Sequence, residues 1–196
     1  MQGILDTASN TCDILFLQEP WQSYISANES RQLSHPDFEM ITPPNGTKAR
    51  PARVAIFFSK INPHLRCTQT KHALDLDALS VELSTPKIES FVAVNIYNNI
   101  VRGDPSHKHT LNRLQNDWSL PERSLILGDF NAHHPLWNSD LSQPKNAADT
   151  LWLMENLKFG LINEPDVLTH YPMNANTPSV IDLALATPPL LEFVSD

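Results

Sequence analysis

The sequence has little cysteine, no long apolar run and few basic residues, and each shortage excludes a class of protein. Two cysteines in 196 residues provide no disulfide framework, and Cys12 and Cys67 lack partners at the spacing of a structural zinc site. No apolar stretch reaches about 18 residues and no charged-then-apolar leader occurs, so neither membrane insertion nor secretion is supported. The composition, 41% hydrophobic and 18% charged, predicts one intracellular, monomeric domain over residues 1–196.

Basic residues number 14 against 22 acidic ones, and the formal net charge of −8 argues at first against a nucleic-acid partner. Their distribution argues the opposite, because residues 45–72 hold six cations and no acidic residue. These cations are Lys48, Arg50, Arg53, Lys60, Arg66 and Lys71. The remaining eight cations and 22 anions leave −14 on the rest of the chain. We expect this basic segment to contact a phosphate backbone, the alternative being solvated loops around a core strand at 54–58.

The segment 124–137 joins a strand-like run to a cluster of polar side chains. The apolar residues 125–127 predict a strand covered on both faces, and Gly128 allows a tight turn after it. Asp129 and Asn131 are two positions apart, so an extended chain projects both side chains to one side. A carboxylate beside an amide suits a site that orients a water molecule and holds a phosphate oxygen. The alternative is an ordinary Asx-rich turn after a core strand.

Three other strand-like runs also carry polar groups. Glu19 follows the apolar run that begins at Asp13, and Tyr97 ends another run with amides around it. Asp182 lies inside a run otherwise fit for the core, where an unpaired carboxylate is costly.

In this order the motifs resemble the endonuclease/exonuclease/phosphatase family of metal-dependent phosphodiesterases. The matching motifs are Leu17-Gln18-Glu19, Asn95-Ile96-Tyr97, Gly128-Asp129-Phe130-Asn131, Ser179-Val180-Ile181-Asp182 and Ser195-Asp196. Within the family, residues 131–137 look most like the endonuclease domain of non-LTR retrotransposons, which nicks DNA. The resemblance implies an α/β fold, a four-layer DNase I-like sandwich of two mixed β-sheets flanked by helices. It also implies that the protein acts in the nucleus and that the domain was once fused to a reverse transcriptase.

The resemblance further implies a role for each matched residue. Glu19 and Asp196 would ligate Mg²⁺, for which Mn²⁺ can substitute. Asp129 would activate the attacking water, Asn131 would hold that water or a phosphate oxygen, and Tyr97 would donate to the scissile phosphate. Asp182 would orient the catalytic histidine of the family. The residues expected to bind substrate are Asn95, Asn98, His133, His134, Trp137, Lys48, Arg50 and Arg53, although Trp137 has a loop-packing role as its alternative.

The match departs from the family at both ends of the sequence. The family motif continues to the catalytic histidine, whereas Asp196 is the last residue here. The first strand of the family is also unmatched, because Met1 falls within the helix that should follow that strand. We therefore expect an incomplete copy with weak or absent catalysis and reduced stability. Nothing in the spacing places His134 or His170 as a replacement for the missing imidazole.

Two alternative functions stay open on the sequence. One is an inositol or lipid phosphatase of the same family, and the other is a nucleic-acid-binding module that has lost catalysis. Cleavage of phosphomonoesters alone supports the first alternative, whereas DNA binding without cleavage supports the second.

Apolar runs and turn residues predict the order of the secondary-structure elements. Strands are expected near 13–18, 53–59, 78–83, 89–97, 124–128 and 180–186, and helices near 1–10, 106–118 and 146–157. Pro188-Pro189 is expected to break the chain before a last short strand. The basic residues at 45–72 are expected to flank the core strand at 54–58.

Overall fold

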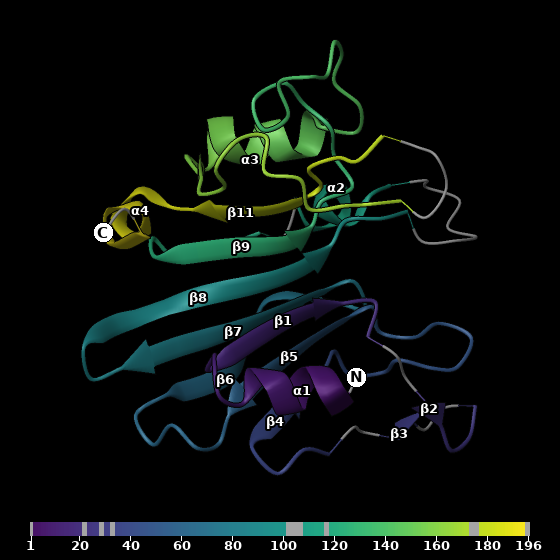
Figure 1. Ribbon diagram of the computed structural model, residues 1–196, viewed down its shortest axis with the longest axis vertical. Coiled ribbons are helices and arrows are strands. Elements are labelled where there is room, and N and C mark those ends of the chain that lie inside the picture. Colours follow the sequence, from purple (N-terminus) through teal and green to yellow (C-terminus); the bar gives the residue numbers. More distant parts are fainter. Residues whose placement is uncertain are drawn as a thin grey trace. The chain divides into compact units, whose positions relative to one another are not determined.

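The computed structural model describes residues 2–20, 23–27, 30–31, 34–100, 108–115, 118–172 and 177–194. The chain divides into two compact units, unit 1 (Met1–Tyr97) and unit 2 (Asn98–Asp196). Figure 1 shows the elements of both, coloured along the sequence. The single domain expected over residues 1–196 stays a prediction.

Unit 1 begins with a helix that packs on a three-stranded antiparallel sheet. Leu5 and Ala8 of the helix lie in one core cluster with Phe38, Ala55 and Phe57 of the sheet, and Figure 1 shows the helix beside these strands. The sheet order is β1-β5-β4, so the apolar β5 is central. The elements are α1 (Gln2–Ala8), β1 (Ile14–Gln18), β4 (Phe38–Ile41) and β5 (Val54–Ser59).

Three longer strands of unit 1 form an antiparallel meander in the order β8-β7-β6. Their residue ranges are β6 (Arg66–Asp75), β7 (Ala78–Thr85) and β8 (Ile88–Tyr97). β5 contacts both β7 and β8, which explains why residues on both of its faces are buried. A small hairpin, β2 (Ser23–Tyr24) with β3 (Ser30–Arg31), completes the unit.

The described residues of unit 2 form three antiparallel strands in the order β10-β11-β9 and three helices. Its fully buried residues include Ile126, Phe130, Trp137, Leu153 and Leu185. The helices α2 and α3 are joined by hydrogen bonds, because Asn112 and Gln115 both donate to the Asp149 carboxylate. The elements are α2 (Thr110–Leu114), β9 (Ser124–Asp129), α3 (Ala148–Asn156), β10 (Gly160–Leu161), β11 (Asp182–Ala186) and α4 (Pro188–Val194).

The structure confirms the six strands predicted from apolar runs, which are β1, β5, β7, β8, β9 and β11, and the helices α1 and α3. The helix predicted near 106–118 is shorter, since α2 covers only Thr110–Leu114 and positions 106–107 and 116–117 lie outside the described residues.

One expectation is wrong. Pro188 and Pro189 begin α4 rather than preceding a strand, because proline suits the first turn of a helix, where no N–H partner is needed. The basic residues flank β5 as expected, and two of them, Arg66 and Lys71, lie inside the unpredicted strand β6. That strand has an exposed face, so it needs no continuous apolar run.

Among the described residues, no helix has the length and apolar character that a membrane crossing requires.

Candidate functional site

In unit 2 the two predicted catalytic carboxylates occupy paired positions of neighbouring strands. Asp129 ends β9, Asp182 begins β11, and the two residues are direct partners in the antiparallel register. Directly opposed residues project to the same face of a sheet, with Cβ atoms about 5 Å apart. The register therefore places Asp129 and Asp182 side by side.

The end of β9 and the turn after it have an unusual backbone conformation. Gly128 has φ 139°, which a side chain would strain, and Asn131 has φ 47°. The Asn131 backbone N–H donates to Oδ1 of Asp129 at 2.8 Å, which orients the carboxylate. The Asn131 Nδ2 is buried and has no hydrogen-bond acceptor in the part of the chain that the structure describes. An amide donor in that state is ready to bind a water molecule or a phosphate oxygen.

Asp182 lies in a partly buried position that favours its protonated form. Burial raises the pKa of this carboxyl, while the Thr169 hydroxyl and the charge of His170 act in the opposite direction without cancelling the rise. Oγ1 of Thr169 also accepts hydrogen bonds from the backbone N–H groups of Ile181 and Asp182, at 3.1 and 3.0 Å. Thr169 thus fixes both the backbone and the charge at the start of β11.

The loop after Asn131 is held by backbone hydrogen bonds and carries the predicted histidines. His133 and Lys145 form a two-way backbone bridge, and burial, with Lys145 and His170, lowers the pKa of His133. Nδ1 of His134 accepts from the Leu136 N–H, and its ring centroid lies 5.2 Å from that of Trp137. Trp137 is fully buried and donates from Nε1 to the Ala132 carbonyl at 3.2 Å. The indole therefore packs the loop.

In unit 1, Glu19 follows β1 as an exposed residue with φ 49°. Its backbone N–H donates to the Arg53 carbonyl at 2.8 Å, which fixes the point where the chain leaves the strand. Tyr97 ends β8 with 7% of its surface exposed. The Arg53 guanidinium lies over its ring, with Cζ 4.7 Å from the centroid.

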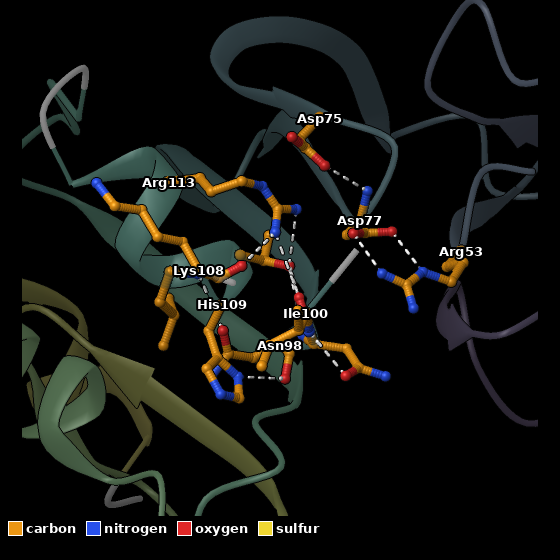
Figure 2. Close-up of polar contacts among 11 residues, drawn as sticks. Arg53, Asp75, Asp77, Asn98, Ile100, Lys108, His109 and Arg113 are labelled. Atoms are coloured by element: carbon orange, nitrogen blue, oxygen red, sulfur yellow. Dashed lines mark hydrogen bonds and ion pairs between the residues drawn. The ribbon is translucent and has the colours of Figure 1, made fainter. Parts of the chain in front are cut away.

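Arg53 is bound to an acidic partner that the sequence did not reveal. Nε and Nη2 donate to the two carboxylate oxygens of Asp77 at 2.6 and 2.5 Å, as Figure 2 shows. Burial lowers the pKa of Arg53, but the hydrogen bond and charge of Asp77, helped by Tyr97 and Glu19, outweigh it and the pKa is raised. By contrast Lys48 and Arg50, also predicted to contact phosphates, are exposed on one turn.

Asn95 and Asn98, expected to bind substrate, are both fully buried. Asn95 donates from Nδ2 to the carbonyls of Leu17 and Ala55, at 3.1 and 2.9 Å, and accepts from Gln18. Its amide thus ties β8 to β1 and β5. Asn98 binds backbone groups of unit 2 in the same manner. Their predicted contact with substrate stays a prediction.

The model of one protein family, described as endonuclease-reverse transcriptase, matches residues 91–195, which is 105 of 196 positions. The chain belongs to the endonuclease-reverse transcriptase family. The structure is also similar to one titled "Endonuclease domain of TRAS1, a telomere-specific non-LTR retrotransposon", at 17% identity and a TM-score of 0.70. That match covers 96% of this chain and 79% of the other. No curated protein matches the sequence.

These findings confirm the predicted resemblance and the predicted fold class, α/β and DNase I-like. The endonuclease-reverse transcriptase match includes Asn95, Tyr97, Asn98, Asp129, Asn131 and Asp182. Glu19 and the basic segment at 45–72 precede it. The role of each residue stays a prediction.

The endonuclease-reverse transcriptase family is generally dependent on a divalent metal. Within the described ranges, no three His, Cys, Asp or Glu side chains are grouped to hold an ion. Mg²⁺ is commonly bound by one or two carboxylates, with waters and substrate phosphates as the other ligands. An exposed carboxylate such as Glu19 fits that kind of site. Asp196, the other predicted ligand, lies outside the described residues.

Proposed function

We propose that this chain is a divalent-metal-dependent phosphodiesterase that nicks DNA, of the retrotransposon endonuclease type. The observation that carries the proposal is the turn after β9. There an oriented Asp129 carboxylate and an unpartnered Asn131 amide stand beside Asp182, in a member of the endonuclease-reverse transcriptase family. A reverse transcriptase as the attached partner and the nucleus as the site of action belong to the same proposal.

In the proposed reaction, Asp129 accepts a proton from water while the water oxygen forms a bond to phosphorus. The phosphodiester P–O bond breaks, and the leaving sugar oxygen takes up a proton. Asn131 donates from Nδ2 to the water or to a phosphate oxygen. Asp182 orients the general acid, which in the family is the catalytic histidine, and this acid protonates the leaving sugar oxygen. These groups act on a charge that grows at the phosphate, where fixed donors are most effective.

The proposed roles in unit 1 concern the metal and the substrate backbone. Glu19 holds the divalent ion, which when bound supplies Lewis-acid stabilisation of phosphate charge. Tyr97 donates a hydrogen bond to the phosphate. Lys48 and Arg50, exposed on their turn, contact DNA phosphates.

The test is nicking of supercoiled plasmid with Mg²⁺ or Mn²⁺. The family motif matched by Ser195-Asp196 continues to a histidine, so the assay is run on the chain and on a form with one histidine appended. Asp129→Ala should lower the rate about 10²–10⁴-fold in whichever form nicks. Glu155→Gln, which changes an exposed carboxylate on α3, should leave the rate unchanged.

Four results would contradict the proposal in different ways. DNA binding by both forms without cleavage supports a binding module. Hydrolysis of phosphomonoesters but not of DNA supports a phosphatase. Equal nicking by Asp129→Ala and by the parent protein removes the proposed catalytic role of Asp129. If the Glu19→Gln variant needs no higher metal concentration than the parent protein, Glu19 does not have the proposed role of metal ligand.

A further inference from the structure

Asn98 makes an unusually complete set of hydrogen bonds at the turn that carries Asp129 and Asn131. Its side chain is fully buried. Its backbone N–H donates to the Asp129 carbonyl at 2.7 Å and its Nδ2 donates to the Phe130 carbonyl at 2.9 Å. Two consecutive carbonyls of the proposed catalytic turn are thus satisfied by one residue.

The same side chain also caps a helix. Oδ1 of Asn98 accepts from the Leu111 N–H at 2.9 Å, in the first turn of α2. The N-cap residue of α2, His109, makes no side-chain capping hydrogen bond. Asn98, which is 13 positions before Leu111 in the sequence, accepts the helix N–H hydrogen bond that an N-cap side chain normally accepts. His109 lies close by, with Nδ1 3.5 Å from the Asn98 carbonyl, as Figure 2 shows.

The opposite edge of the turn is held by β11. The Phe130 N–H donates to the Ile181 carbonyl at 2.8 Å, so the Phe130 peptide group is fixed at both its N–H and its carbonyl. Without the Asn98 side-chain amide the Phe130 carbonyl loses its donor and the Leu111 N–H loses its acceptor, and each unsatisfied buried group costs about 1–3 kcal/mol. The chain would relieve that cost by shifting the turn, and the Asp129 carboxylate would move with it.

We propose that Asn98 is a positioning residue, which sets the Asp129–Asn131 turn without touching the substrate. The inference rests on the proposed function and deepens it. It offers an alternative to our expectation that Asn98 binds substrate, because both the Nδ2 and the Oδ1 of its side chain bind protein backbone. The position needs a donor and an acceptor on one short planar group, which among the amino acids asparagine provides.

The first test compares Asn98→Leu with a matched control, Thr187→Val. Thr187 is also buried, and its hydroxyl accepts from the Ser124 N–H and donates to the Ser124 carbonyl. It lies by the start of β9, about 16 Å along the strand from Asp129. We expect Asn98→Leu to lower kcat for plasmid nicking about 10–100-fold, with KM changed less than about threefold. Thr187→Val should leave kcat unchanged.

A second variant, Asn98→Asp, separates positioning from general damage. When protonated, the introduced carboxyl can donate to the Phe130 carbonyl and accept from the Leu111 N–H, as the amide does. Burial raises the pKa of such a group, so the protonated form persists into the mildly acidic range. The ratio of variant to parent kcat should therefore approach one in acid and fall as pH rises. His109, whose ring lies against the Asn98 carbonyl, is present in both proteins, so any contribution it makes cancels in the ratio.

A third measurement needs no enzymatic activity. The Asn131 N–H, which donates to Asp129, should exchange with deuterium faster in Asn98→Leu than in the parent, and at the parent rate in Thr187→Val. Equal exchange in the two variants, or a pH-independent kcat ratio for Asn98→Asp, would overturn the inference. If neither the chain nor its histidine-appended form nicks DNA, the proposed function fails, and the exchange rates alone still decide whether Asn98 holds the turn.

Discussion

Replacement of Arg53 by methionine should destabilise the protein more than a change in a basic surface segment normally does. The guanidinium makes two charge-assisted hydrogen bonds to Asp77, whose side chain is only 2% exposed. Methionine retains much of the volume but neither donor. Asp77 then stays buried without its cation, and the protein must protonate the carboxyl or open the structure to hydrate it.

The magnitude follows from the exposure of the two partners. Removing one partner of a buried ion pair costs about 3–5 kcal/mol. The Arg53 side chain is 22% exposed, so water can reach part of the site and the lower end of that range applies, about 3 kcal/mol. Loss of the guanidinium over the Tyr97 ring adds about 0.5–1 kcal/mol. Domains are stable by about 5–15 kcal/mol, so the change is a large fraction of the total.

The assay is urea unfolding followed by circular dichroism. The exposed cation Lys48 provides the control, because Lys48→Met should change the free energy of unfolding by less than about 0.5 kcal/mol. The double variant Arg53→Met with Asp77→Leu should recover most of the loss, since no buried charge remains. A loss below about 1 kcal/mol for Arg53→Met, or no recovery in the double variant, would refute the reasoning.

Two further predictions concern titrating groups. Burial raises the pKa of Asp182, so the folded state binds this proton more tightly than the unfolded state and loses stability as pH rises through the folded pKa. Asp182→Asn should therefore raise the midpoint of thermal unfolding at neutral pH and lower the rate of nicking. The rise in the unfolding midpoint should vanish below about pH 3.9, and a rise that persists below that pH contradicts the prediction. Burial, together with Glu39, raises the pKa of Cys67 to about 12. In Cys12→Ser, Ellman's reagent at about pH 8 should then modify Cys67 more than about 100-fold more slowly than free glutathione, and comparable rates would disprove the shielding.

The strands that could be predicted from the sequence are those that are at least partly buried and therefore contain consecutive apolar residues. β5 is the central strand of its sheet and is buried at nearly every position, and β9 carries the apolar run 125–127 with every second position buried. β6 could not be predicted, because its sequence alternates polar, basic and small residues and most of its positions are at least partly exposed. Its hydrogen bonds to β7, rather than its own apolar pattern, make it a strand.

The site was predictable only where a motif carried the information. Asp129, Asn131 and Asp182 were marked by polar groups next to apolar runs, and the register of β9 with β11 pairs two of them. Asp77 and Thr169 were not marked, since a carboxylate or hydroxyl in a loop does not show which distant group it will bind. Arg53 looked like a free cation for the same reason, because its partner is 24 positions away.

The pairing of Asp129 with Asp182 limits how the gene can change in length. Removal of one codon within β9 or β11 shifts the register by one residue and turns one carboxylate to the opposite face. The exposed turns of the connection between the two strands have no such restriction, because residues can be added there without moving either strand. Length variation among homologues should therefore accumulate at exposed turn positions such as 142–144 and be rare in the two short strands.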